Sequence, residues 1–335
     1  MAHDRLLQYS TATTSILTNF LLIYLISYKS PEHIGNYKYL LIFISAFEML
    51  YGVLDIIASP LSFSYGPTFI IIVPHKETVF GADVAMFLNI LYCSFFGFSM
   101  GMFVIIFAYR LLASTGSNLL TYFPGVRIIF WFVYPLFHGI VWGVSTAFPL
   151  APSRAMDDFI RESITEKFNM SLDDVAYTGM LFFSYEDNKR IIHHNSVLAT
   201  LVQWTLTTLS LLMVIVFGFK CYYRINALLK VQAQMSGVMR ETQTQLFVAL
   251  VVQALIPLIL MHIPVLALYT CSLLNIDMDA TFVCVTISLF PALDPFPTLI
   301  IIKSYREATL DLLKSALRIK RFTPKFKISQ TASPS

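Results

Sequence analysis

Residues Leu246–Tyr269 read LFVALVVQALIPLILMHIPVLALY, a run of 24 residues that contains no Asp, Glu, Lys or Arg. A helix that crosses the hydrocarbon core of a bilayer needs about 20 mostly apolar residues. The run therefore predicts a membrane-spanning helix. Pro257 and Pro264 interrupt it, and because proline frees backbone carbonyls we expect kinks there that give the helix a capacity to bend.

Six further stretches share this length and apolar character: Leu7–Tyr28, Tyr39–Ser59, Val84–Ala108, Val126–Phe148, Val197–Phe219 and Ala280–Ile302. No ten-residue units of alternating polarity occur, which argues against a transmembrane barrel. The pattern predicts an all-α membrane protein. Residues 1–302 form a seven-transmembrane helix bundle, and residues 303–335 form a tail.

The composition of the whole chain agrees with this prediction. Hydrophobic residues make up 56% of the 335 residues, charged residues make up 13%, and the mean hydropathy is +0.68. A soluble domain carries about 25% charged residues, so the composition excludes a cytosolic enzyme and a disordered chain. With 4 cysteines, a disulfide-stapled secreted domain is excluded too. No motif of a zinc protease, serine hydrolase or P-loop protein occurs, and we expect no catalytic residue, cofactor, metal or nucleic-acid partner.

Basic residues predict the orientation of the chain. If the N-terminus is outside, 16 of the 23 Lys and Arg residues fall in inner segments and 7 fall outside, five of them in the long loop 149–195. Because basic residues favour the cytoplasmic side, the prediction is N-terminus outside and C-terminus inside. The triplet Asn169-Met170-Ser171, an acceptor sequence for N-glycosylation, lies in this outer loop.

The long loop admits two interpretations. It forms a lid or binding surface, as loops of this length often do, or it is a tolerated and weakly ordered insertion. It contains no cysteine, so it cannot form a disulfide with the third helix. Cys271 and Cys284 flank the last outer loop and either pair or remain buried thiols.

The tail begins with an amphipathic stretch. Apolar residues alternate with Lys314 and Arg318 over residues Ser304–Ile319, which is typical of a short helix lying on an anionic membrane surface. Topology and membrane adhesion alone explain the basic charge of the inner segments, and a role in binding a partner is the alternative.

Four charged residues fall within or at the ends of the predicted spans. Glu48 and Asp55 are seven residues apart in the second span, Asp294 precedes Pro295 in the seventh, and Arg110 closes the third. Charges in a membrane are costly and mark functional sites by default. The acids either form a structural polar cluster or, for Asp55, line a water-filled cavity. Arg110 either extends to the interface or serves a function.

Three motifs resemble a known family. Gly35–Leu41 reads GNYKYLL, Gln245–Pro257 reads QLFVALVVQALIP, and Leu293-Asp294-Pro295 is followed by Ile300–Arg306, which reads IIIKSYR. These stretches are similar to G-x-Y-K-Y-L, Q-L-F-x-A-L-x-x-Q-x-x-I-P and L-D-P…I-x-x-Y-R in nematode seven-transmembrane chemoreceptors of the Str type. That group includes the diacetyl odorant receptor.

The resemblance implies a G-protein-coupled olfactory receptor in the plasma membrane of sensory neuron cilia. Its partners would be a small, weakly polar ligand, a heterotrimeric G protein and the lipid bilayer. Arg110 stands where rhodopsin-like receptors keep the arginine of D-R-Y, but Tyr109 replaces the acid before it. Asp294-Pro295 stands where those receptors keep N-P-x-x-Y.

Under this interpretation the expected residues fall into three groups. The ligand pocket comprises Asp55, Phe87, Tyr92, Phe95, Phe96, Trp204 and His262. The activation network comprises Glu48, Arg110, Pro257, Asp294 and Pro295, and the G-protein contacts comprise Arg110, Arg224, Lys230, Arg240 and Lys303. The alternative is a proton- or cation-coupled transporter or channel that uses the three buried acids, although no internal repeat supports it.

Overall fold

A computed structural model describes residues 2–30, 34–76, 78–123, 125–231 and 237–319. Seven helices in this part of the chain are long and apolar enough to cross a membrane, which confirms the predicted seven-helix bundle. Their bounds are α1 Ala2–Lys29, α2 Tyr37–Ala58, α3 Ala82–Thr115, α4 Ile129–Ala147, α6 His194–Val231, the sixth span (α7 Gly237–Pro257, the π-helical turn η5 Leu258–His262 and α8 Ile263–Leu273), and the seventh span (α9 Thr281–Leu293 with α10 Pro295–Ile301).

The outer surface of the bundle is apolar. Phe20 of α1 is 63% exposed and Phe130 of α4 is 73% exposed, and similar side chains lie along α6. A soluble protein buries such side chains or binds a partner through them. Here they form the face that the hydrocarbon of a bilayer covers.

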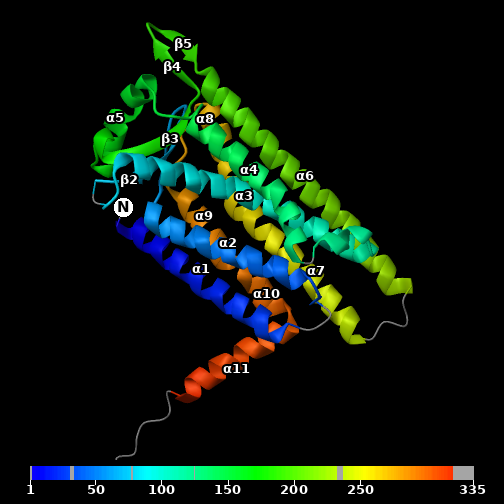
Figure 1. Ribbon diagram of the computed structural model, residues 1–335. Coiled ribbons are helices and arrows are strands. Elements are labelled where there is room, and N and C mark those ends of the chain that lie inside the picture. Colours follow the sequence, from blue (N-terminus) through cyan, green and yellow to red (C-terminus); the bar gives the residue numbers. More distant parts are fainter. Residues whose placement is uncertain (1, 31–33, 77, 124, 232–236, 320–335) are drawn as a thin grey trace, which may run out of the picture.

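α3 is the central helix, and small residues bring α4 close to it (Figure 1). A Cβ atom at Gly97 of α3 would collide with the Trp142 side chain of α4, and one at Gly143 of α4 would collide with the Ser94 side chain of α3. Close backbone approach through glycine is a usual way for helices to pack in lipid, where no hydrophobic force drives them together.

The sixth and seventh spans are interrupted near the expected prolines. Pro257 is followed by a π-helical turn over Leu258–His262, and the seventh span breaks at Asp294, before Pro295. Proline cannot donate the helical hydrogen bond, so the helix changes its pitch or direction there.

A folded layer covers the end of the bundle near the N-terminus (Figure 1). Strands β1 Leu61–Tyr65, β2 Thr68–Pro74 and β3 Val175–Leu181 form an antiparallel sheet in the order β1-β2-β3. The helix α5 Arg154–Phe168 packs against it, and a separate hydrophobic core lies between them. We call β1, β2, β3 and α5 the cap. The part of the loop 149–195 in this layer is therefore folded, and the sequence had not predicted the hairpin between α2 and α3.

Local sequence explains the elements of the cap. Met156, Ile160, Ile164 and Phe168 recur every four residues and give α5 one buried apolar face. Gly66, with a φ of +52°, forms the two-residue turn between β1 and β2. In the protruding hairpin of β4 Phe183–Glu186 and β5 Lys189–Ile192, Asp187 and Asn188 both have positive φ, as a tight turn of this kind requires.

Charged pairs hold the cap to its neighbours. Lys167 of α5 lies 3.1 Å from a carboxylate oxygen of Asp279, which precedes α9. Hydrogen bonds from the Thr281 hydroxyl and backbone N–H, together with Lys167, lower the pKa of Asp279 to about 2. Similarly, the Ser171 backbone N–H and Lys76 lower the pKa of Asp174. These contacts join segments that lie far apart in the sequence.

The opposite end of the bundle carries short helices. The 3₁₀ turns η2 Asn118–Tyr122 and η3 Gly125–Ile128 connect α3 to α4, so the fourth span predicted from residue 126 begins with a 3₁₀ turn. Helix α11 Lys303–Ile319 turns away from α10 (Figure 1). Leu310, Leu312 and Leu313 of α11 are exposed apolar residues, as expected of a helix that lies on a surface.

We predict that Ile164→Ala loosens the cap without unfolding the bundle. The Ile164 side chain is fully buried in the core of the cap, and deleting its methyl groups leaves a cavity that costs about 2–5 kcal/mol. Hydrogen exchange would become faster in residues 61–74 and 154–181 and stay unchanged in α3. Glu162→Ala, on the exposed face of the same helix, serves as the control, with an expected change within about 0.5 kcal/mol. Uniform loss of protection across the bundle would contradict the prediction.

Candidate functional site

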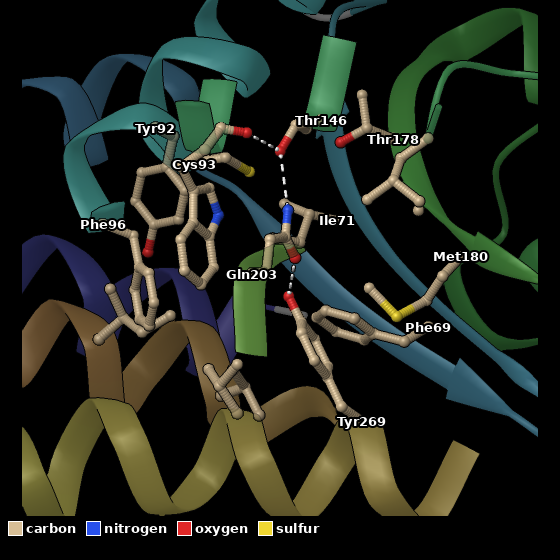
Figure 2. Close-up of a pocket in the computed structure, with 16 residues that line it drawn as sticks. Phe69, Ile71, Tyr92, Cys93, Phe96, Thr146, Thr178, Met180, Gln203 and Tyr269 are labelled. Carbon is tan, nitrogen blue, oxygen red and sulfur yellow. Dashed lines mark hydrogen bonds between the residues drawn. The ribbon is translucent and has the colours of Figure 1, made fainter. Parts of the chain in front are cut away.

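A small cavity lies between the cap and the helix bundle (Figure 2). Its walls come from both layers: the sheet contributes strands β2 and β3, and the bundle contributes the third, fourth, fifth, sixth and seventh spans. The lining residues are Phe69, Ile71, Tyr92, Cys93, Phe96, Trp142, Thr146, Leu150, Thr178, Gly179, Met180, Gln203, Val265, Tyr269, Val283 and Ile287. None of them carries a charge. The free space is about 40 Å³, enough for roughly two or three water molecules.

A hydrogen-bonded chain of polar side chains crosses one side of the cavity. The Tyr269 hydroxyl donates to Oε1 of Gln203 at 2.8 Å, and Nε2 of Gln203 donates to the Ser145 hydroxyl at 3.0 Å. The Thr146 hydroxyl is 3.5 Å from the same Nε2 and donates to the Trp142 carbonyl at 3.0 Å (Figure 2). Gln203 on α6 therefore joins α4 to α8, through partners that satisfy both ends of its buried amide.

The rest of the wall is mainly aromatic. The rings of Phe96 and Trp142 lie 4.9 Å apart, and those of Phe69 and Tyr269 lie 5.9 Å apart. The Tyr92 hydroxyl is buried and makes no hydrogen bond within the described residues that meets standard geometry. The cavity therefore offers mainly flat apolar faces to a ligand.

The cap closes the cavity through close backbone packing. Gly179 of β3 lies against Phe69 and Ile70 of β2, where a Cβ atom would collide with backbone atoms. Asn89 of α3 donates to the Ile71 carbonyl at 2.8 Å, and the Thr178 hydroxyl reaches the other side of the same amide at 3.4 Å. One buried Asn of the bundle thus holds two strands of the cap.

The residues expected in the pocket are only partly brought together. Tyr92 and Phe96 line the cavity. Phe87 is 61% exposed on the outer surface, and Phe95 packs against Phe47 and Tyr51. Neither side chain lines the cavity.

Trp204, His262 and Asp55 also lie away from the cavity. Trp204 is half-buried, next in sequence to Gln203. Nδ1 of His262 is 3.1 Å from the Pro257 carbonyl, across the π-helical turn. Gln8 and Ser288 both donate to the Asp55 carboxylate, at 2.9 and 2.6 Å, so Asp55 joins α1, α2 and α9.

The other two acids form a second cluster deeper in the bundle. The carboxyl groups of Glu48 and Asp294 lie within electrostatic range of each other, and the Asn19 side chain lies beside Glu48. Gln253 donates to Asp294 at 3.0 Å, and Asn19 donates to the Pro291 carbonyl at 2.9 Å. The cluster connects the first, second, sixth and seventh spans.

Three of the basic residues expected to contact a G protein lie at the opposite end. Arg110 is buried near the end of α3, and Arg224 and Lys303 are exposed. The side chains of Lys230 and Arg240 lie outside the described part of the chain, as do residues 320–335 of the tail. Asn169 is exposed at the C-terminus of α5. Cys271 and Cys284 are both free thiols, so the disulfide left open by the sequence does not form in this structure.

Sequence reasoning missed most of the cavity lining. Gln203 is a single amide side chain in an apolar span. Because a polar side chain is costly to place in hydrocarbon, the sequence could have indicated that it has a role. Thr178, Gly179 and Met180 could not have been found, because only the pairing of β3 with β2 brings them over the bundle.

The fold is that of a seven-helix membrane protein. The structure of squid rhodopsin superimposes with a TM-score of 0.61 over 99% of this chain and 92% of that chain, at 11% identity, which is a likeness of fold. The family model of the serpentine type 7TM GPCR chemoreceptor Str matches residues 4–310. The chain belongs to this Str family of chemoreceptors, which are receptors and not enzymes.

Curated relatives agree with the family. The G-protein coupled receptor str-217 of Caenorhabditis elegans is 48% identical over 302 residues, which cover 90% of this chain and 87% of the relative. The serpentine receptor class r-10 of the same organism is 24% identical over 95% of this chain and 94% of its own length. The G-protein coupled receptor str-33 is 24% identical over 89% of this chain and 87% of its own length. The chain is thus a multi-pass membrane receptor of the chemoreceptor type.

We predict that Gln203→Leu destabilises the bundle. It leaves the Tyr269 hydroxyl without its buried acceptor, which costs about 1–3 kcal/mol, and it removes one of the two hydrogen bonds of the Ser145 hydroxyl, which still donates to the Trp142 carbonyl. The melting temperature of the purified protein, read from the exposure of buried thiols, should fall. Thr205→Ala changes an exposed residue of the same helix and should leave the melting temperature unchanged. An unchanged melting temperature for Gln203→Leu would show that the hydrogen-bonded chain contributes nothing.

Proposed function

We propose that the chain is an olfactory receptor for a small, weakly polar molecule that binds in the cavity beneath the cap. One observation carries the proposal: an uncharged cavity with aromatic walls lies at the junction of five spans and the cap, with a single chain of polar side chains along one side. Ligand pockets are typically apolar with few polar groups that fix orientation. A charged ligand would leave its charge unpaired in this cavity.

The size of the cavity suggests how a ligand acts. Its free space of about 40 Å³ is too small for most organic molecules. A ligand must therefore favour an arrangement in which the walls have moved apart. A molecule that binds one arrangement better than another shifts the population toward it, by no more than its differential affinity. Val265 and Tyr269 of α8 and Ile287 of α9 belong to the interrupted spans, so these walls have the means to move.

The proposed orientation puts the cap outside and α11 inside, with the cell-surface membrane of sensory cilia as the location. The distribution of basic residues supports it, since sixteen of them lie in the segments assigned to the inside. Arg110, Arg224 and Lys303 lie at the α11 end, and we propose this end, with Lys230 and Arg240, as the contact for a heterotrimeric G protein. The cluster of Glu48 and Asp294, with the break before Pro295 and the turn after Pro257, lies between the two ends and belongs to the proposed activation network.

A ligand panel tests the proposal in cells that co-express a promiscuous G protein. We predict that a small neutral odorant raises second-messenger levels and that Arg110→Ala abolishes the response while surface expression holds. Val265→Phe, which fills the cavity, should lower potency about tenfold or more and shift preference toward smaller ligands. Ile263→Phe, on the exposed face of the same helix, is the matched control and should respond like the unmodified receptor.

Two outcomes would count against the proposal. If the ligand were equally potent on the Val265→Phe and Ile263→Phe receptors, it would not bind in the cavity. A ligand-gated current or uptake that persists without any G protein would favour the transporter or channel instead, with Glu48, Asp55 and Asp294 as its path.

The orientation has a separate test at Asn169. We predict that glycosidase treatment of receptor from a secretory expression host increases its gel mobility, because an outer Asn169 meets the glycosylation machinery. Asn169→Gln should remove the shift, whereas Ser171→Thr, which keeps the acceptor sequence, should retain it. A receptor with no glycan but full surface expression would contradict the prediction at this site.

A further inference from the structure

Arg110 is a buried cation whose charge meets an aromatic ring. Its side chain, at the α11 end of α3, is 6% exposed, and its guanidinium carbon lies 3.8 Å from the centroid of the Tyr37 ring. Nε and Nη2 of Arg110 make no hydrogen bond within the described residues. A buried ion ordinarily pairs with an opposite charge and fills its hydrogen-bonding positions. Here the face of the Tyr37 ring stands where an opposite charge would ordinarily be.

No carboxylate of the described residues forms an ion pair with Arg110. The position before Arg110, where rhodopsin-like receptors keep an acid, is occupied by Tyr109. The phenols of Tyr109 and Tyr305 and the thiol of Cys221 lie within electrostatic range of the guanidinium. Tyr305, in the first turn of α11, shares a 2.6 Å hydrogen bond with Ser30, which follows α1. The surroundings of the cation are therefore phenols and a thiol.

Tyr37 is itself held by a chain of rings. It stacks on Tyr109 with centroids 5.1 Å apart, Tyr109 meets Phe123 edge to face at 4.5 Å, and Phe123 stacks on Trp131 at 4.2 Å. Tyr37, Tyr109 and Phe123 are all buried. Aromatic pairs in these geometries gain more than their buried area alone provides. The chain runs from the start of α2, past the end of α3, through the η2–η3 connection and into α4.

We infer that Tyr37 positions Arg110 in the resting receptor through this cation–π contact, and that Nε and Nη2 remain open for hydrogen-bond acceptors of a partner protein at the α11 end. The idea rests on the proposed function in that the partner is the G protein. Tyr37 itself is a positioning residue: it holds the arginine and touches no ligand. Carbonyl or carboxylate groups of the partner satisfy the two donors and compete with the ring for the guanidinium.

Cys221 provides a reporter inside the molecule that needs no G protein. It is fully buried on α6 and lies within electrostatic range of Arg110. Movement of α3 away from α6 at this end would expose the thiol to a maleimide. The rate of labelling of the Cys221 peptide, followed by mass spectrometry on the full chain in nanodiscs, therefore measures how often the contact opens.

We predict that the labelling rate follows the electron density of the ring at position 37 and not its size. Tyr37→Leu loses the cation–π contact and should label about 5- to 30-fold faster, the shift that a desolvated contact of this kind supports. Tyr37→Phe keeps the ring face and should stay within about twofold of the unmodified receptor. Basal nucleotide exchange on a co-expressed promiscuous G protein should rise in the same order.

Two further sets of variants separate the contact from simple packing. Phenylalanines with increasing numbers of fluorine atoms, incorporated at position 37, keep the ring and withdraw its electron density, so labelling should accelerate with each step even if Tyr37→Leu fails to fold. Arg110→Gln removes the cation. In that background, Tyr37→Leu should accelerate Cys221 labelling less than it does in the unmodified receptor, because the two residues no longer interact.

The readouts distinguish the inference from the proposed function. Faster Cys221 labelling in the leucine and fluorinated variants, without any G-protein response, would support the role of Tyr37 and overturn coupling at this end. The inference would be overturned if the rate of Cys221 labelling did not change along the fluorine series and was equal in Tyr37→Phe and Tyr37→Leu. This holds whatever the G-protein assay gives.

Discussion

Polar groups buried among hydrocarbon must find partners within the protein, and this constraint organises the bundle. Gln203 of the fifth span bonds to hydroxyls of the fourth and sixth, and Asp55 of the second accepts from the first and seventh. Gln253 of the sixth span donates to Asp294 of the seventh, beside Glu48 of the second. Since lipid gives apolar side chains no reason to prefer one another, such contacts and close small-residue packing decide which helices are neighbours.

The cap is held in place by a different set of interactions. No cysteine lies in the segment between α4 and α6, so the cap is fastened by backbone pairing of β2 with β3 and by the apolar core under α5. Asn89 then ties the sheet to α3. A layer attached in this way opens at a cost set by packing and hydrogen bonds, without any covalent bond to break. That suits a site whose resting cavity is smaller than its proposed ligand.

The two ends of the bundle are built from contrasting chemistry. The cavity beneath the cap is uncharged, whereas the α11 end contains a buried guanidinium against a tyrosine ring. The prolines of the sixth and seventh spans, with the acid cluster between them, lie on the connection between these ends. In our proposal, these segments transmit a change in helix arrangement from the cavity to Arg110.

The sequence by itself determined the seven spans, the fold class and the family motifs, because hydrophobic length is a property of contiguous residues. It also located Tyr92, Phe96 and Arg110 on the third span. Only the tertiary structure decided which side chains face the cavity: Phe87 and Phe95 lie on the same helix as Tyr92, yet they point to the outer surface and to Phe47. Helix rotation and strand pairing depend on contacts between segments far apart in the chain, such as Thr178 beside Asn89 and Tyr37 beside Arg110. No local pattern encodes those contacts, because each depends on the position of its partner.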